Sequence, residues 1–151
     1  MTLLDASLRR LGIEGLGEVP WGTHFCLFYT TAEDLLDLLV PYFKTGLEDH
    51  EFCLWVAETP KEVEHARQAM REGVPNFEQY VMEGQIEFVT YAGWYLSNGN
   101  FASRRVIQRW IDILQQVLDK GHVGMHIRHP IRNIIYRDSL QHRYGRACDR
   151  R

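Results

Sequence analysis

The segment from residue 21 to residue 58 constrains the fold more than any other part of this 151-residue chain. The apolar, aromatic run His24 to Tyr29 predicts a buried strand, and a stretch with helical spacing follows a short polar loop and ends at Gly46. A second apolar run, Phe52 to Ala57, predicts another buried strand. This order predicts a parallel sheet, and the loop before the helix is where a nucleotide-binding α/β protein carries its phosphate-binding loop.

That loop lacks the residues that bind phosphate. From Tyr29 to Asp34 it contains no glycine and no Lys-Ser or Lys-Thr pair, so the Walker A motif is absent. The carboxylates of Glu33 and Asp34 would repel phosphates, which disfavours ATP. Thr30 or Thr31 caps the following helix, or the same crevice holds a different small ligand; the sequence leaves both readings open.

The rest of the chain continues the alternation of strands and helices. Thr59 and Pro60 begin a helix, 85–91 predicts a strand, 101–120 the longest helix, and 123–127 a further strand. We therefore expect an α/β fold of three layers, with a mainly parallel sheet of about four or five strands and helices on both faces. Leucines at helical spacing from Leu3 to Leu11 predict a short amphipathic helix before a glycine-rich linker.

Composition and charge exclude some classes of partner. The formal net charge is −3, which gives no overall field for nucleic acid or an anionic membrane, and the arginine-rich tail is more typical of a solvated end. The apolar runs are too short to span a membrane, and the first ten residues do not resemble a signal peptide. We therefore expect a cytoplasmic protein for which membrane and nucleic-acid binding are both disfavoured.

Candidate ligand-binding residues follow the ends of the predicted strands. Glu58 ends the second strand at the same edge as Tyr29, and Tyr91, Trp94 and Tyr95 follow the third. Aromatic side chains at such an edge either wall an apolar pocket or anchor the loop over the sheet. The predicted site consists of Tyr29, Thr30, Thr31, Glu33, Glu58, Tyr91, Trp94 and Tyr95.

A metal or redox site is a weaker alternative. His24 and Cys26 share one face of the predicted first strand, and Cys53 on a neighbouring strand offers a third ligand. Two ligands are too few for a closed zinc site, and a buried histidine beside a small apolar cysteine is the commoner arrangement. We expect no cofactor, and no motif for a catalytic nucleophile or acid pair is present.

Four short motifs follow one another along the chain. They are Gly22-x-His24-x-Cys26-x-x-Tyr29, Phe43-x-x-Gly46-Leu47, Glu51-x-Cys53-Leu54-x-Val56 and Trp94-Tyr95-Leu96-x-x-Gly99-x-Phe101. In this order and spacing they resemble the motifs of a known family, the MEDS domain (methanogen/methylotroph DcmR sensory domain). The resemblance ends after His126, where the family pattern continues with a turn and a Trp-containing helix and this chain has an arginine-rich tail.

The resemblance implies a RecA/KaiC-like core without a functional phosphate loop and a non-enzymatic sensory role in prokaryotic signalling. The implied ligand is a small one-carbon or hydrocarbon-derived molecule, and the implied partner is a histidine kinase or a transcription regulator; a homodimer is a further expectation. The expected division is an N-terminal helix and linker (1–18), a sensory domain (19–128) and an atypical tail (129–151). The alternatives are a residual KaiC-like nucleotide-binding ATPase and a Cys/His redox or metal sensor.

Overall fold

The computed structural model describes residues 8–97, 100–101 and 103–130. The amphipathic helix expected from Leu3 to Leu11 therefore lies partly outside the described residues. The arginine-rich tail lies outside them beyond residue 130. The described elements are β1 (Leu8–Arg10), β2 (Glu18–Pro20), α1 (Ala32–Glu48), β3 (Phe52–Ala57), α2 (Pro60–Gly73), α3 (Phe77–Met82), β4 (Ile86–Thr90), α4 (Tyr91–Tyr95), β5 (Leu96–Ser97), β6 (Asn100–Phe101), α5 (Ser103–Asp119) and β7 (Met125–Arg128).

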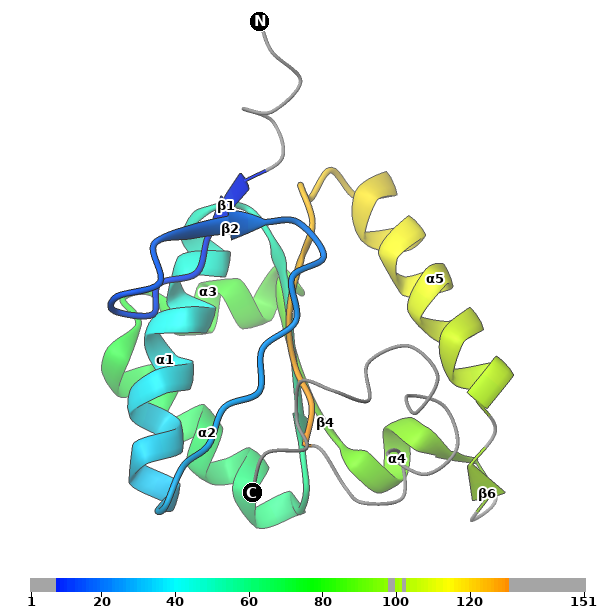
Figure 1. Ribbon diagram of the computed structural model, residues 1–151, viewed down its shortest axis with the longest axis horizontal. Helices are drawn as coiled ribbons and strands as arrows, with labels where there is room; N and C mark the ends of the chain where they lie inside the picture. The colour runs from blue at the N-terminus through cyan, green and yellow to red at the C-terminus, as the bar shows by residue number, and fades with distance from the viewer. Residues whose placement is uncertain (1–7, 98–99, 102, 131–151) are drawn as a thin grey trace, which may run out of the picture.

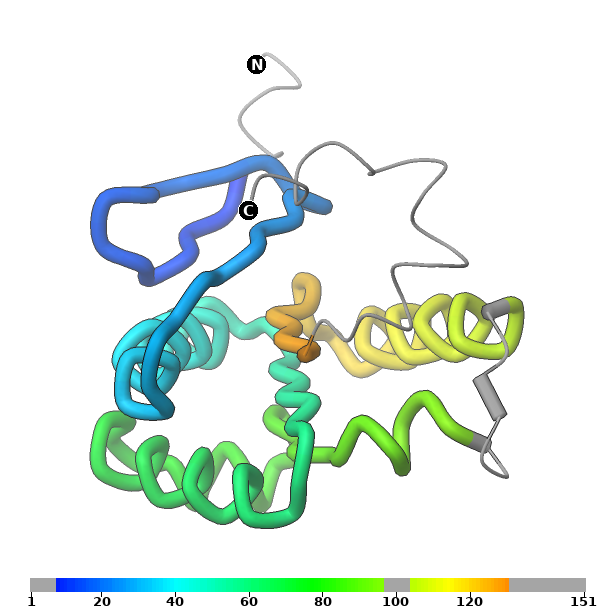
Figure 2. Tube along the Cα trace, turned by 60° about the horizontal axis from the view of Figure 1, so that its bottom comes forward, coloured from blue at the N-terminus to red at the C-terminus, as the bar shows by residue number. Residues whose placement is uncertain are grey.

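A parallel sheet with the order β4-β3-β7 forms the middle layer. Helices α1, α2 and α3 cover one face, and α4 and α5 cover the other (Figures 1 and 2). The prediction of a mixed α/β fold with helices on both faces of a parallel sheet is confirmed. The described residues place three strands in this sheet, fewer than the four or five expected.

The central strand β3 explains why the apolar run at 52–57 has no polar face. All six of its residues are buried, because both faces are covered by helices. Cys53, Trp55 and Ala57 pack towards α1 and α2 in one apolar cluster. Phe52, Leu54 and Val56 pack towards α4 and α5 in the other.

The segment predicted as the first strand, His24 to Tyr29, is irregular in the structure, so this prediction is wrong. It connects β2 to α1 (Figure 2) and pairs with none of the sheet strands β3, β4 and β7. The side chain of Phe28 is 78% exposed. An apolar run shows only that a segment is able to be buried. Whether it becomes a strand depends on a neighbouring strand that accepts its backbone hydrogen bonds, which a local pattern does not report.

The N-terminal part of the described chain also differs from expectation. Where the helix was expected to end, β1 pairs antiparallel with β2, and Arg9 lies opposite Val19. The glycines expected to form a linker lie in the turn of this hairpin, three of them at positive φ (Gly12, Gly15 and Gly17). Leu8 to Arg10 therefore does not form the end of a helix, and the Arg9 side chain of the hairpin reaches Glu51 in the domain.

Arg9 closes a buried charged cluster with Glu51 and His126, which we call the Arg9–Glu51–His126 cluster. The Glu51 Oε2 atom lies 2.8 Å from Arg9 Nη2 and 2.7 Å from His126 Nδ1. The side chains of Glu51 and His126 are 1% and 0% exposed. Arg9 Nη1 also donates to the Met125 carbonyl oxygen. The cluster therefore ties the hairpin to the amino ends of β3 and β7.

Gly46 in α1 makes room for this cluster. A Cβ atom at residue 46 would lie 2.6 Å from His126 Cγ, closer than a real Cβ atom comes, and would be crowded by Cys53 Sγ at 3.0 Å. Gly46 was predicted to end the helix, but α1 continues to Glu48 and also passes through Pro41. The glycine is needed for a close approach between helix and sheet rather than for a turn.

The segment after β4, predicted to be an aromatic loop, contains the short helix α4 and the two-residue strands β5 and β6. Thr90 begins α4, because its Oγ1 atom accepts a hydrogen bond from the Gly93 N–H at 3.3 Å. The strand and cap together place the α4 aromatics at the carboxyl end of β4.

We expect the stability of the domain to fall as the pH drops from 7.5 to 5.5. Burial lowers the pKa of His126 below its usual 6.5, and burial also lowers the pKa of His129. The unfolded chain then binds protons near pH 6.5 that the folded chain does not bind, so acid favours unfolding. Urea unfolding across this range measures the effect.

The variant His126→Asn is the matched test of this pH dependence. It keeps a side-chain donor for Glu51 and removes one titrating group, so its free energy of unfolding should depend less steeply on pH. A wild-type stability that stays constant or rises towards pH 5.5 would contradict the prediction.

Candidate functional site

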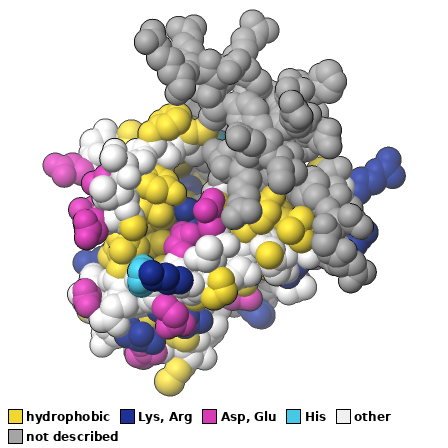
Figure 3. All heavy atoms as spheres, turned by 90° about the horizontal axis from the view of Figure 1, so that it is seen from below, with side chains coloured by type: hydrophobic (Ala, Val, Ile, Leu, Met, Phe, Trp, Pro, Cys, Tyr) yellow, Lys and Arg dark blue, Asp and Glu magenta, His cyan; other side chains and the backbone are white. Residues whose placement is uncertain are grey.

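The carboxyl edge of the parallel sheet is the candidate functional site. The strands end there at Ala57, Thr90 and Arg128. Crevices at this edge are the usual ligand sites of open α/β sheets. Figure 3 views the molecule from this side, and acidic side chains lie in the middle of the described surface between groups of apolar ones.

A partly buried ion pair joins two of the strand ends to α2. Arg128 is 8% exposed, and its Nη1 atom donates to the Val56 carbonyl oxygen at 2.8 Å and lies 2.5 Å from Glu62 Oε1. The other carboxylate oxygen of Glu62 accepts from the Glu58 N–H at 2.8 Å. The Glu62 side chain therefore accepts a backbone hydrogen bond at the start of α2 and also pairs with Arg128 at the end of β7. We call this arrangement the Glu62–Arg128 pair.

Only one member of this pair was predictable from the local sequence. The motif from Thr59 to Glu62 predicts a helix cap, and the Thr59 hydroxyl does accept from the Glu62 N–H. Arg128 was not among the predicted site residues. The available signal was a cation directly after an apolar strand, because a charge in such a position needs a partner. Glu58 itself is exposed, and its role as a ligand-binding acid stays a prediction.

The start of α1 forms a closed cap. Asp34 N–H donates to Thr31 Oγ1 at 3.1 Å, and Asp34 Oδ2 accepts from the backbone N–H groups of Thr31 and Thr30 at 2.9 and 3.2 Å. These hydrogen bonds, first that from the Thr31 backbone, lower the pKa of the Asp34 carboxyl. A phosphate bound here would need the backbone N–H groups of Thr30 and Thr31 as donors, so the phosphate would first have to displace the Asp34 carboxylate from them. The cap therefore weighs against the nucleotide-binding alternative.

The α4 aromatics form a second group at the edge. Tyr91, Trp94 and Tyr95 are buried, and the Trp94 ring lies 5.4 Å from that of Trp110 on α5. The Arg109 guanidinium lies 3.9 Å from the Trp94 ring centroid and donates to the Trp94 carbonyl oxygen. Trp94 Nε1 is buried and has no hydrogen-bond partner among the residues that the structure describes. Burial also raises the pKa of Tyr95.

His129 connects the α4 aromatics to the Glu62–Arg128 pair. Its ring lies 6.3 Å from that of Tyr95, and it follows Arg128 in the chain. Its pKa is lowered mainly by burial, with smaller contributions from the positive charges of His24 and Arg128. His24, predicted to lie within a strand, therefore lies near the end of β7.

Seven of the eight predicted site residues, all except Glu58, fall into two groups. Tyr29, Thr30, Thr31 and Glu33 belong to the start of α1 and its preceding loop, and all four are exposed. Tyr91, Trp94 and Tyr95 pack in the cluster on the other face of the sheet. The structure brings the α4 group together with His129 at the edge. The whole eight-residue site remains a prediction.

The three residues proposed as metal or redox ligands occupy different surroundings. Cys53 is fully buried near the start of β3, its Sγ atom lies 3.6 Å from the Phe43 carbonyl oxygen, and burial raises its pKa. A thiol with a raised pKa is a weak ligand and nucleophile. Cys26 lies in the irregular segment before α1. Among the described residues, no group of three or more His, Cys, Asp or Glu side chains is arranged to hold a metal ion.

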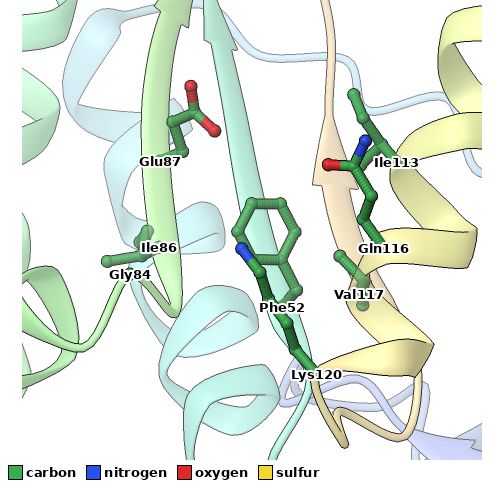
Figure 4. Close-up of a pocket in the computed structure, with 8 residues that line it drawn as sticks. All are labelled: Phe52, Gly84, Ile86, Glu87, Ile113, Gln116, Val117 and Lys120. Atoms are coloured by element: carbon green, nitrogen blue, oxygen red, sulfur yellow. The ribbon is translucent and has the colours of Figure 1, made fainter.

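A cavity of about 310 Å³ lies at the opposite edge of the sheet, between β4 and α5 (Figure 4). Apolar residues and a rim of Glu87, Gln116 and Lys120 line it. The full lining is Phe52, Gly84, Ile86, Glu87, Ile113, Gln116, Val117 and Lys120. None of the predicted site residues lies here.

Comparison with known families decides how the chain is classified. A family model described as "MEthanogen/methylotroph, DcmR Sensory domain" (MEDS) matches residues 23–130. The chain belongs to the MEDS family. The resemblance of the short motifs to this family is thereby confirmed, and a sensory domain favours a binding role over catalysis.

Two further comparisons add nothing to this classification. No curated protein and no solved structure matches the chain. In the part of the chain that the structure describes, no helix has the length and apolar character needed to cross a bilayer.

Proposed function

We propose that this MEDS domain is a non-enzymatic sensor of a small one-carbon or hydrocarbon-derived molecule, bound at the carboxyl edge of its sheet. The observation that carries the proposal is the sensory family match over residues 23–130. The edge supports it because an apolar group, the α4 aromatics, adjoins a few fixed polar groups at the Glu62–Arg128 pair. Such a mixture is typical of small-molecule sites.

The Glu62–Arg128 pair suggests how binding would be transmitted. It links the start of α2 to the end of β7, so a ligand that contacts Arg128 changes how these two elements hold each other. A ligand shifts a population only by its difference in affinity for the two arrangements. We propose that a cytoplasmic histidine kinase or transcription regulator reads the arrangement.

The fold supports a distant kinship with RecA/KaiC-type domains, which we include in the proposal. The support is a parallel sheet in which a helix precedes β3 at the place of the phosphate-loop helix. In this chain the Asp34 carboxylate takes the backbone N–H groups of Thr30 and Thr31. On this proposal, the backbone N–H groups that bind phosphate in the relatives are satisfied here by the chain's own Asp34 side chain.

The test uses the four tryptophan indole N–H signals in ¹H–¹⁵N NMR spectra, assigned with Trp→Phe variants. Methanol, dichloromethane and formate are titrated separately, as polar, apolar and anionic one-carbon probes. We expect at least one to shift the Trp94 signal saturably and leave that of Trp55, which is 0% exposed in the core, unchanged. Saturation separates a site from a general solvent effect.

The variant Trp94→Phe keeps an aromatic ring and removes the indole N–H, so binding to it is followed through the indole signal of Trp110, whose ring lies 5.4 Å from that of Trp94 in the wild type. We expect it to weaken binding by up to about tenfold, the effect of one lost hydrogen bond. Trp21→Phe, which alters the ring beside Arg9 at the other end of the sheet, is the control and should bind as the wild type does. Titrations in which Trp94 never responds would contradict the placement, and micromolar affinity for Mg²⁺-ATP would favour the nucleotide-binding alternative.

A further inference from the structure

Helix α5 carries two apolar stripes, and only one of them packs against the domain. The inner stripe contacts the cluster on the α4 and α5 face of the sheet and consists of Val106, Trp110, Ile113 and Val117. The outer stripe is exposed and consists of Ile107, Ile111, Leu114 and Leu118, with exposed fractions of 57%, 55%, 44% and 45%. Most surface helices need only the inner stripe.

The outer stripe has the spacing of a helix-pairing seam. Its residues follow one another at intervals of four, three and four, which places them along one line of the helix. The α5 residues that line the cavity against β4 lie on a different side of the helix. In Figure 1, α5 lies at the rim of the molecule, on the side of the sheet away from α1 and α2.

The charged side chains of α5 are placed unfavourably for its helix dipole, with cations at its start and an anion at its end. Arg104 and Arg105 lie in the first turn, Asp112 lies in the second half and Asp119 ends the helix, followed by Lys120. The first turn contains no acidic residue and the last turn no basic one. Cations at the start of a helix and anions at its end are unfavourable in an isolated helix. A second helix running in the opposite direction would bring opposite charges together.

We propose that two copies of this chain pair through the outer stripes of α5, antiparallel about a two-fold axis. The stripe matches its own reversed copy, because Ile107 then faces Leu118 of the second copy and Ile111 faces Leu114. Such self-complementarity is what a two-fold interface requires. The neutral side chains of Gln108 and Gln115 flank the stripe, so no like charges meet there.

The charge pattern selects the antiparallel arrangement. In an antiparallel pair the Arg104 end of one helix lies beside the Asp119 end of the other, twice per dimer. In a parallel pair Arg104 would meet Arg104 and Asp119 would meet Asp119, which is repulsive.

The first test measures the mass of the full chain by sedimentation equilibrium over a range of concentrations. The wild type should form a dimer, and the Ile111→Lys variant should weaken it by at least about tenfold, because the charge is buried twice per interface. Met82→Lys is the matched control, since Met82 is an exposed apolar residue (84%) on α3, and it should dimerise like the wild type. Circular dichroism melting checks that each variant folds.

The second test reverses the charges. Arg104→Glu and Asp119→Arg should each weaken the dimer, and the double variant should restore it, since opposite charges meet again. A wild type that is monomeric at all concentrations would overturn the proposal, as would equal weakening by Met82→Lys. A double variant that stays as weak as the single ones would overturn the antiparallel arrangement.

Discussion

Replacing Glu51 by alanine is expected to lower the free energy of unfolding by about 3–5 kcal/mol, the usual cost of removing one partner from a buried ion pair. The change leaves Arg9 without its carboxylate, although the Arg9 side chain is only 12% exposed. It also removes the hydrogen-bond partner of His126, which is fully buried. Chemical denaturation followed by circular dichroism measures the loss.

The neighbouring pair Arg10–Asp49 provides the control. It joins the same hairpin to the end of α1, but its side chains are 55% and 28% exposed. Asp49→Ala should therefore cost less than about 1 kcal/mol. The double variant Arg9→Met with Glu51→Leu should be more stable than Glu51→Ala, because no charge is left buried alone. Equal losses for Glu51→Ala and Asp49→Ala would show that the Arg9–Glu51–His126 cluster does not hold the hairpin.

Replacing Trp55 by alanine should cost about 3–5 kcal/mol, the range for removing a large aromatic side chain from a core. Trp55 is 0% exposed at the centre of the middle layer. Its ring stacks on Phe43 of α1 at 4.9 Å and on Phe88 of β4 at 5.8 Å. The change therefore opens a cavity between helix and sheet. Thermal or urea unfolding measures its cost.

Trp55→Phe separates ring packing from hydrogen bonding. The Trp55 Nε1 atom is buried and has no hydrogen-bond partner within the described part of the chain, so phenylalanine removes an unsatisfied donor and keeps most of the contact with Phe43. We expect a loss below about 1.5 kcal/mol. Met82→Ala, at an exposed position, should change stability by less than about 0.5 kcal/mol. A loss for Trp55→Phe as large as for Trp55→Ala would show that the indole N–H is satisfied in the protein.

The two proposals concern different parts of the molecule and fail separately. The proposed ligand site is at the carboxyl edge of the sheet, at the α4 aromatics and the Glu62–Arg128 pair. The proposed dimer uses the outer stripe of α5. Trp110 joins them, because it belongs to the inner stripe and its ring lies 5.4 Å from that of Trp94. A ligand that moves Trp94 would therefore act on the helix through which two copies pair.

Local signals in the sequence located most of the elements. Caps and turns predicted the starts of α1 and α2, because a cap depends on residues three positions apart. Apolar runs predicted β3 and β4, and helical periodicity predicted α5. The motifs also identified the family. The candidate site was predictable only as residues that follow strand ends, since the chain order of a parallel sheet places those ends at one edge.

Contacts between distant residues were decided by the tertiary structure. Arg9 meets His126 across 117 positions, and Leu8–Arg10, where the end of a helix was expected, is a strand of the hairpin. Glu62 was predictable as a cap, but its pairing with Arg128 depends on β7 lying beside β3. His24 to Tyr29 has the composition of a strand, yet it pairs with none of the described strands β3, β4 and β7. Local patterns of residues were therefore enough to predict most helices and strands and to identify the family. The pairing of faces could not be read from them, because the energy of each contact depends on the partner that the fold places opposite.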